Sequence, residues 1–298
     1  MSAGKPANIA ASIRQRLKNI SKDKSRPFNE LLQYYAMERF LYRLSKSKHA
    51  ICFILKGALM LRAWHSPELR PTMDIDMLGK TSNEIDSIVE QVKDIISVDA
   101  EPDGLVFDLD SIQAERIKED ADYEGVRVRF IGTLDNARVH MQIDVGFDDI
   151  VHPEPVVTEF PTILDSPVPK LLCYSRESAI AEKFEAMLKL GQLNSRMKDF
   201  YDIWLLSTQF DFDGNELSEA IRLTLEHRDT EIPEVITAFT KAFIEEKQIQ
   251  WKAFHKRLAQ EHVPHDFGVI AADIQVFLEP VMNGGKVTSK WSASSTWI

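Results

Sequence analysis

The stretch RPTMDIDMLG, residues Arg70 to Gly79, contains two aspartates separated by one apolar residue. Residues 73–78 alternate in the manner of a β-strand, in which side chains two positions apart point to the same face. Asp74 and Asp76 would therefore repel each other unless a cation lies between them. Because Mg²⁺ prefers carboxylate oxygens, the pair predicts a metal site of the kind that phosphoryl and nucleotidyl transfer use.

A third carboxylate follows on a later alternating segment, HMQIDVGF, residues 140–147. Asp144 lies there between two β-branched residues, where an unpaired charge would be unfavourable. We expect Asp144 to lie on a strand beside the first two aspartates and to share their ion. Asp148 and Asp149 are weaker candidates for the same role.

A glycine precedes the paired aspartates at a predicted strand-to-helix turn. In FILKGALMLR, residues 53–62, Gly57 separates a buried strand from a short helix. Such a glycine allows backbone N–H groups to approach a phosphate, although an ordinary tight turn would give the same local pattern. The order of glycine turn, paired aspartates and later aspartate is more specific than any of the three features alone.

Hydrophobic periodicity predicts an α/β region followed by a helical region. The α/β region has predicted helices at 8–20, 28–45 and 82–96, and predicted strands at 50–55, 73–78, 104–117, 126–134 and 139–147, with a hairpin turn at 135–137. The helical region begins with a helix capped by Ser175 and ended by Gly191, and continues with helices at 195–209, 215–228, 233–246, 250–261 and 264–280. The tail, 284–298, is predicted to be irregular. Five prolines over residues 152–169 predict an extended crossover and a domain boundary.

The composition is that of a globular protein, with 298 residues of which 44% are hydrophobic and 28% charged. Two cysteines and eight histidines without HExxH spacing indicate neither a disulfide framework nor a zinc site. The longest apolar stretch, residues 50–64, is interrupted by Lys56 and Arg62 and is too short to span a bilayer. The first residues have no continuous apolar signal-peptide core. We therefore expect a soluble, cytoplasmic protein with no membrane partner.

The formal net charge is −10, but it is unevenly distributed. Residues 1–50 contain 11 Lys/Arg and 3 Asp/Glu, which gives this segment a net charge of +8. An acidic protein is not expected to bind nucleic acid indiscriminately. The basic leading segment could contact phosphates, or it could form a solvated helix face.

The order of these motifs resembles the DNA polymerase β nucleotidyltransferase superfamily. Within it, LKGALMLRAW and RPTMDIDM, followed by AIAEKFEAMLKLG and SRMKDFYDIWLL, are similar to the AbiEii/AbiGii toxin family over roughly residues 30–210. Those proteins are nucleotidyltransferase-like toxins of bacterial toxin–antitoxin and abortive-infection systems. The resemblance implies an α/β (α+β) fold, with a mixed nucleotidyltransferase-type sheet and flanking helices, followed by a helical C-terminal lobe.

The resemblance also implies roles for individual residues. Asp74 and Asp76 match the metal-binding aspartates, and Asp144 matches a third ligand by position. Lys183 matches a lysine near the nucleotide phosphates, and Asp199 matches a further catalytic acid. The superfamily usually has Gly-Ser or Gly-Gly at the turn where this chain has glycine and alanine, so Thr72 or backbone N–H groups would have to supply the missing contact. The implied nucleotide-binding residues are Lys56, Gly57, Ala58, Thr72 and Lys183.

The residues around Lys183 allow two interpretations. Ile180, Phe184 and Met187 form the apolar face of a helix spanning residues 178–190, and Lys183 lies at the edge of that face. A lysine there could simply lie along the surface, and Asp199 could belong to an ion-pair ladder. We expect instead that Lys183 faces the same cleft as the paired aspartates, and that Asp199 holds its ammonium group when the site is empty.

The sequence thus predicts a basic helical arm at 1–27, a nucleotidyltransferase-like domain at 28–165 and a mostly helical domain at 166–298. The predicted activity is nucleotide transfer from an NTP, with Mg²⁺ or Mn²⁺ as cofactor. The family resemblance suggests RNA, such as tRNA, as the acceptor and an AbiEi-type antitoxin as a partner. Two alternatives remain open: a protein or small-molecule acceptor, or a degenerate fold that only binds a partner.

Overall fold

The computed structural model describes residues 8–66, 70–119, 123–282, 288–293 and 296–298. The chain divides into two compact units, Met1–Asp148 with Val156–Cys173, and Asp149–Pro155 with Tyr174–Ile298. We call them the sheet unit and the helical unit. The proline-rich segment 152–169 contributes residues to both units: residues 152–155 belong to the helical unit, and residues 156–169 belong to the sheet unit and include one strand of its sheet, Val156–Glu159.

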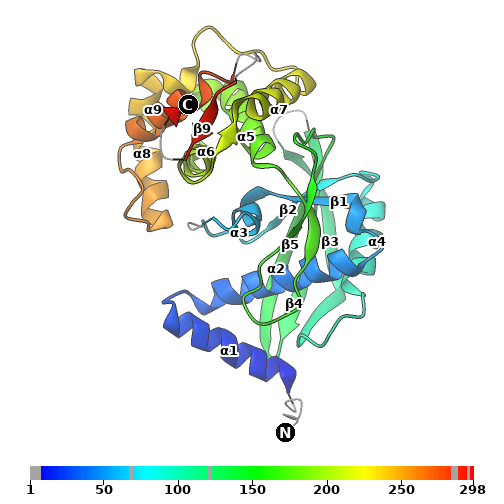
Figure 1. The fold of residues 1–298 in the computed structure, drawn as a ribbon. Helices are drawn as coiled ribbons and strands as arrows, with labels where there is room; N and C mark the ends of the chain where they lie inside the picture. Colours follow the sequence, from blue (N-terminus) through cyan, green and yellow to red (C-terminus); the bar gives the residue numbers. More distant parts are fainter. Residues whose placement is uncertain (1–7, 67–69, 120–122, 283–287, 294–295) are drawn as a thin grey trace. The chain divides into compact units, whose positions relative to one another are not determined.

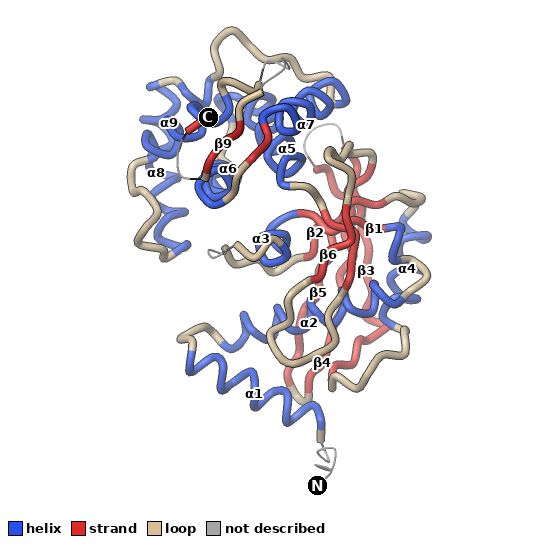
Figure 2. Tube along the Cα trace, viewed as in Figure 1, coloured by secondary structure: helices blue, strands red, loops and turns tan. Residues whose placement is uncertain are grey.

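One mixed sheet of seven strands, counted over the described residues, forms the sheet unit in the order β3-β4-β5-β2-β1-β7-β6 (Figure 2). Strands β2 and β5 are parallel, as are β1 and β7, and the other neighbours are antiparallel. The seven strands are β1 (Phe53–Lys56), β2 (Ile75–Gly79), β3 (Leu105–Glu119), β4 (Tyr123–Leu134), β5 (Ala137–Phe147), β6 (Val156–Glu159) and β7 (Lys170–Cys173). This mixed sheet with flanking helices confirms the predicted fold class.

The two faces of the sheet differ because successive side chains of a strand point in opposite directions. On β4, Val126, Val128 and Phe130 are buried, and Phe130 contacts Phe40 of helix α2 with ring centroids 5.9 Å apart. Helix α2 (Phe28–Lys46) runs along the sheet, and α4 (Ile85–Ile96) contacts α2, β3 and β4 (Figure 1). The alternate β4 residues, Arg127 and Arg129, lie on the opposite face, which is the polar face of the sheet.

Helix α1 (Ile9–Asp23) packs against α2 through the buried side chains of Ile13 and Leu17. The side chain of Asn8 caps it by accepting a hydrogen bond from the Ala11 N–H at 3.0 Å. Since one face of α1 is part of the core, only its outer face is available to a partner.

The structure corrects two predictions in the sheet unit. Residues 50–52 form a turn of 3₁₀ helix instead of the start of a strand. The pairing of β1 with β2 begins only at Phe53, which is opposite Gly79, the last residue of β2. The strand predicted at 73–78 begins at Ile75. Backbone pairing there starts only where β5 lies alongside, with Ile75 opposite Ile143.

The helical unit contains five α-helices and a small three-stranded sheet within the described residues. The helices are α5 (Arg176–Leu190), α6 (Met197–Gln209), α7 (Gly214–His227), α8 (Lys241–Leu258) and α9 (Phe267–Leu278), and the strands are β8 (Phe212–Asp213), β9 (Lys290–Ser292) and β10 (Thr296–Trp297). Its core is aromatic, with Phe200 and Phe267 ring centroids 5.0 Å apart. Ser175 caps α5 and Gly191 ends it at φ 46°, as predicted.

Two predictions for the helical unit were wrong. The helices expected at 233–246 and 250–261 are one helix, α8, which starts at residue 241 because Thr240 caps it. The polar run between them continues the helix, since Lys247 is buried on the same face as Phe243 and Trp251. The tail forms strands β9 and β10 where it is described, because Trp291 packs on Phe277 at 4.9 Å; residues 284–287 and 294–295 lie outside the described residues.

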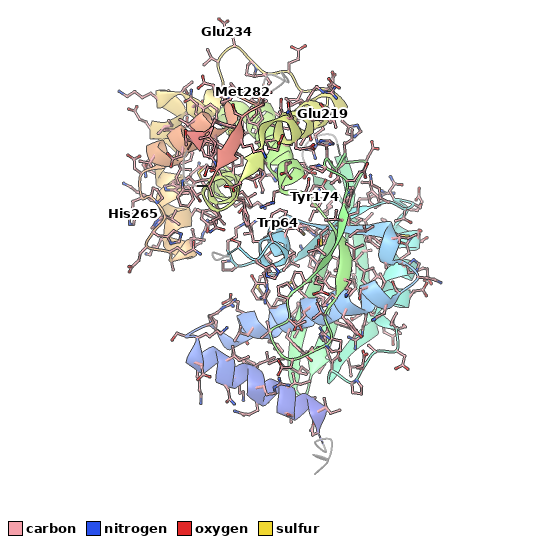
Figure 3. All side chains as sticks on the ribbon, viewed as in Figure 1. Trp64, Tyr174, Glu219, Glu234, His265 and Met282 are labelled. Carbon is pink, nitrogen blue, oxygen red and sulfur yellow. The ribbon has the colours of Figure 1, made fainter. Side chains whose placement is uncertain are left out.

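Charged and apolar side chains are both exposed on loops of the helical unit, where Val235 is 65% exposed. Figure 3 shows Glu234 and His265, which are exposed on the loops that precede α8 and α9. Across the described part of both units, none of the helices has the length and apolar composition that crossing a bilayer requires.

A buried carboxyl on α2 predicts a pH-dependent stability. Glu38 and Arg39 are each 1% exposed, their Oε1 and Nη2 atoms lie 3.1 Å apart, and the Ile163 N–H donates to Glu38 Oε2 at 2.7 Å. Burial raises the pKa of Glu38 to about 7, although Arg39 opposes the rise. The folded protein therefore holds this proton more tightly than the unfolded chain does, and stability is lost as the pH rises through 7.

Glu38→Gln, which imitates the protonated acid, is expected to stabilise the protein relative to wild type more at pH 8 than at pH 5. The difference should be at most on the order of 3 kcal/mol, from about 1.4 kcal/mol per pKa unit. Urea unfolding of both proteins at each pH measures it. A constant difference between the two proteins across this range would mean that Glu38 is already ionised at pH 5.

Candidate metal and nucleotide site

A row of charged side chains crosses the polar face of the sheet, because five strands are in register there. Lys56 of β1 is opposite Asp76 of β2, which is opposite Asp144 of β5. Asp144 is opposite Arg127 of β4, which is opposite Glu115 of β3. Residues directly opposite each other lie on the same face of a sheet. The adjacent acids Asp76 and Asp144 are therefore flanked as a pair, by Lys56 on one side and by Arg127 on the other.

The three predicted metal ligands lie together. Each of Asp74, Asp76 and Asp144 offers a carboxylate oxygen within 4.8 Å of the oxygens of the other two. Asp144 is 5% exposed, and the other two are half-buried. Three carboxylates at this separation suit a hard divalent cation such as Mg²⁺ or Mn²⁺, which binds oxygen ligands.

Neighbouring side chains hold two of these carboxylates in place. Arg127 donates to both oxygens of Asp144, from Nε at 2.7 Å and from Nη2 at 2.6 Å, and Gln142 donates to Oδ2 at 3.2 Å. The hydrogen bonds to Asp144 raise the pKa of Arg127, so its guanidinium group keeps its charge. The Thr72 hydroxyl donates to Asp74 Oδ1, and the Thr72 N–H in turn donates to the Tyr34 hydroxyl at 3.2 Å.

The glycine turn contacts the acidic cluster directly. Gly57 has φ +71°, and a Cβ atom at this position would lie 1.9 Å from Asp76 Oδ2. The position therefore requires glycine twice over, for its backbone conformation and for the close approach of the carboxylate. Lys56 and Ala58 flank Gly57 in the sequence and were predicted with it to bind the nucleotide; both are buried.

Gly57→Ala is expected to remove nearly all transfer activity and to lower stability. The left-handed backbone alone costs about 1–2 kcal/mol for a residue with a Cβ, and Asp76 must also move out of the cluster. Gly191→Ala is the matched control, because Gly191 has φ +46° but its Cβ would meet nothing closer than 3.9 Å. Thermal unfolding and a transfer assay on both variants separate backbone strain from the collision. Equal losses of activity in the two variants would contradict a role for the Gly57–Asp76 contact.

Lys183 and Asp199 lie in the helical unit and contact each other. Lys183 Nζ is 2.8 Å from Asp199 Oδ1 and 2.8 Å from Asp202 Oδ2, and Arg196 Nε is 2.6 Å from Asp199 Oδ2. The two aspartates are 3% and 4% exposed. Burial by itself raises the pKa of Asp199, but the charges of Lys183 and Arg196 outweigh it and the pKa lies below its ordinary value.

The predicted site residues therefore form two groups, one in each unit. The sheet unit brings together Lys56, Gly57, Ala58, Thr72, Asp74, Asp76 and Asp144. The helical unit brings together Lys183 and Asp199. Of the weaker candidates, Asp148 is exposed at the end of β5, and Asp149 belongs to the helical unit, where Arg228 Nη2 lies 2.7 Å from it.

Arg127 is the site residue that sequence reasoning missed, although a signal for it exists. The hairpin between β4 and β5 pairs Leu134 with Ala137 across a two-residue turn. Arg127 and Asp144 each lie seven residues from these positions, so they must face each other if the hairpin is regular. Counting the register outward finds the pair only from the two-residue turn, 135–136; the three-residue turn predicted at 135–137 shifts the register by one and would place Val145 opposite Arg127.

Comparison with known proteins gives a match over most of the chain. A family model described as "Nucleotidyl transferase AbiEii toxin, Type IV TA system" matches residues 39–273. No curated protein matches the chain.

Two solved structures from Helicobacter pylori are similar to the chain at low identity. One is JHP933, with 15% identity and a TM-score of 0.46, covering 84% of this chain and 93% of that one. The other is provisionally described as a nucleotidyltransferase, with 14% identity and a TM-score of 0.42, covering 84% of this chain and 96% of that one.

Proposed function

Because the chain belongs to the AbiEii family of nucleotidyl transferase toxins of type IV toxin–antitoxin systems, we propose that it transfers a nucleotide from an NTP to an RNA acceptor such as tRNA. The observation that supports this most strongly is the cluster of Asp74, Asp76 and Asp144, with their oxygens within 4.8 Å of one another. A plain sheet face would keep like charges apart, because their repulsion has no compensation there.

In this proposal, Asp74, Asp76 and Asp144 hold Mg²⁺ or Mn²⁺. The ion, when bound, supplies positive charge that offsets the triphosphate and favours the ionised form of the acceptor hydroxyl. Arg127 keeps the Asp144 carboxylate oriented through its two hydrogen bonds, and Thr72 does the same for Asp74. These contacts preorganise the oxygens before any ligand arrives, which is how a site avoids reorganisation during the reaction.

The phosphates of the NTP are proposed to bind at the turn formed by Lys56, Gly57 and Ala58. Gly57 admits a close approach of other groups to the backbone, and Lys56 contributes a cation in the same row as Asp76. Lys183 is proposed to neutralise further phosphate charge and Asp199 to hold it ready, on the basis of the family resemblance.

The type IV family implies an antitoxin, and we propose that an AbiEi-type protein fills this role. The reaction would take place in the cytoplasm, where NTPs are available.

A labelled-nucleotide screen tests the proposal. The protein is incubated with each of the four α-labelled NTPs, together with either total RNA or total protein from a bacterial lysate, in EDTA and with Mg²⁺ or Mn²⁺ added back. We expect label in RNA, only with metal, and with a preference among the four nucleotides. Label in protein would favour the alternative acceptor class, and no label in either fraction would contradict the proposed activity.

A further inference from the structure

A cavity of about 670 Å³ opens beside Asp74 within the sheet unit. Residues of α2, β3, β4 and β5 line it, and the polar ones most relevant here are Asn29, Gln33, Gln113, Arg129, Arg138 and Gln142. This volume lies in the range of sites that bind a small molecule or one nucleotide unit. Asp74 and Gln142 of this lining already belong to the acidic cluster and its hydrogen bonds, but the rest of the cavity has no role in the chemistry assigned so far.

The location of the cavity relative to the glycine turn follows from the strand order. Across the sheet, β4, β5, β2 and β1 are consecutive neighbours. Gly57 directly follows β1, the acidic cluster lies on β2 and β5, and the cavity is lined by β3, β4 and β5. The acidic cluster therefore separates the proposed phosphate turn from the cavity.

Nucleotidyl transfer constrains what can occupy each side of the cluster. The acceptor hydroxyl oxygen forms a bond to the α-phosphorus while the bond from that phosphorus to the bridging oxygen breaks. Pyrophosphate leaves, and the hydroxyl proton passes to a carboxylate or to water. Attacking and leaving oxygens lie roughly in line on opposite sides of the phosphorus. If pyrophosphate leaves on the β1 side, the acceptor must enter from the β5 side.

We propose that this cavity binds the terminal nucleotide of the RNA acceptor, an assignment that rests on the proposed function. Arg129 and Arg138 are exposed, and guanidinium groups match the geometry of phosphate oxygens. The amides of Gln113 and Gln142 offer donors and acceptors of the kind that base edges require. Asp74 lies at the end of the cavity nearest the acidic cluster. Among the described residues that line the cavity, it is the one with a carboxylate.

The fixed shape of the cavity comes from hydrogen bonds in its wall. The Gln33 amide donates to the carbonyl oxygens of Met73 at 3.0 Å and His140 at 3.1 Å, which ties α2 to the segment entering β2 and to β5. Arg129 donates to Glu115 at 2.7 Å and to Gln142 at 3.2 Å. The wall beside Asp74 is thus preorganised, which limits the ordering cost of binding.

Basic residues continue beyond the cavity. Arg138 lies next to the β4–β5 turn, where Arg14 of α1 is 3.2 Å from Asp135. Arg16 and Lys22 are exposed on the same helix. A nucleic acid strand that leaves the cavity at this turn would therefore meet further cations, whereas a protein hydroxyl acceptor would have no use for them. This favours RNA over a protein as the occupant.

Binding of an RNA hairpin with a short single-stranded 3′ end, labelled with fluorescein at its 5′ end, tests the proposal in the absence of NTP. We expect the double variant Arg129→Ala/Arg138→Ala to weaken binding by about tenfold, and to reduce the slope of log affinity against log salt by about 1 to 2. In transfer assays the KM for RNA should rise, while the KM for NTP and kcat should change little.

Arg116→Ala is the matched control, because Arg116 is an exposed arginine of β3 with its own ion pair, 3.7 Å from Glu84. It is adjacent in sequence to Glu115 and so points to the opposite face of the sheet. Unchanged RNA affinity in the double variant would overturn the proposal even if transfer occurs. A raised KM for NTP instead of RNA would assign the cavity to the base of the NTP and would also overturn it. RNA binding is measured without NTP and so does not depend on catalysis. A protein that binds RNA as expected but transfers no nucleotide would contradict the proposed activity, and the binding result would remain separate from it.

Discussion

Asp76→Asn is expected to abolish nucleotide transfer while leaving the sheet unit folded. Asp76 lies between Lys56 and Asp144 in the charged row, and its Oδ2 is the atom that Gly57 accommodates. Removing one of three carboxylates lowers the negative charge that holds a divalent ion, and an amide is a weaker ligand. Without the ion, the charge of the triphosphate is left uncompensated, so transfer should fall by several orders of magnitude.

The same variant should be no less stable than wild type in EDTA. Three carboxylates with oxygens within 4.8 Å repel one another when no ion is present, so removing one charge relieves repulsion. Wild type should gain thermal stability when Mn²⁺ is added, because an ion that binds only the folded state stabilises it. The variant should lose that gain, and this readout does not depend on any transfer assay.

Asp86→Asn serves as the control for Asp76→Asn, since Asp86 is an exposed aspartate in the first turn of α4, away from the cluster. It should keep both transfer and the Mn²⁺-dependent rise in Tm. Wild-type transfer by Asp76→Asn, or an unchanged response of its Tm to Mn²⁺, would remove the metal assignment.

Much of the acidic cluster could be predicted because short-range periodicity determines it. Strand alternation places Asp74 and Asp76 on one face, and an isolated acid among apolar residues pointed to Asp144. The partner strand was not predictable from composition: β2 pairs with β5 in parallel, and this long-range choice depends on packing of the whole sheet. Arg127 depended on the local hairpin register, and the predicted turn was one residue too long to place Arg127 opposite Asp144.

The errors in the helical unit have a different physical cause. Lys247 is buried on the core-facing side of α8. Because a charged residue is not expected on an apolar helix face, the polarity pattern predicted an end of the helix there. Trp291 gave no periodic signal, because a three-residue strand is too short to show one, yet its ring packs on Phe277 and fixes β9. In both cases tertiary packing, which the local pattern does not contain, decided the outcome.

Lys183→Ala is expected to lower transfer by orders of magnitude and, contrary to what the sequence suggests, to destabilise the helical unit. From sequence, Lys183 lies at the edge of an apolar face, so no loss of stability is expected. In the structure its side chain is 19% exposed and its ammonium group lies 2.8 Å from both Asp199 and Asp202. Removing it takes this cation from both buried carboxylates, while Arg196 Nε still lies 2.6 Å from Asp199 Oδ2. Loss of one partner from a buried ion pair typically costs about 3–5 kcal/mol.

The pH dependence of that loss identifies its source. Because the pKa of Asp199 is lowered in the folded state, its contribution to stability is present above the pKa of the unfolded chain and is lost as the pH falls through the folded value. Lys183→Ala should therefore be most destabilised near neutral pH, relative to wild type, and the difference should shrink in acid. Urea unfolding between pH 3 and pH 7 measures this.

Separating the two effects of Lys183 requires variants that retain a fold. Lys183→Arg keeps a cation between the two aspartates, so it should restore most of the stability; it should restore transfer only in part, because a planar guanidinium does not replace a compact ammonium group at a phosphate.

Asp202→Asn, with Lys183 and Asp199 still paired, controls for disturbance of the ion-pair network without loss of the lysine. Transfer should be measured well below the Tm of each variant, per mole of folded protein. A Lys183→Ala protein that is destabilised but transfers at the wild-type rate would show that Lys183 serves only the ion-pair network of α5 and α6. If Asp202→Asn lost transfer as fully as Lys183→Ala did, the network as a whole, and not the ammonium group, would be what the reaction needs.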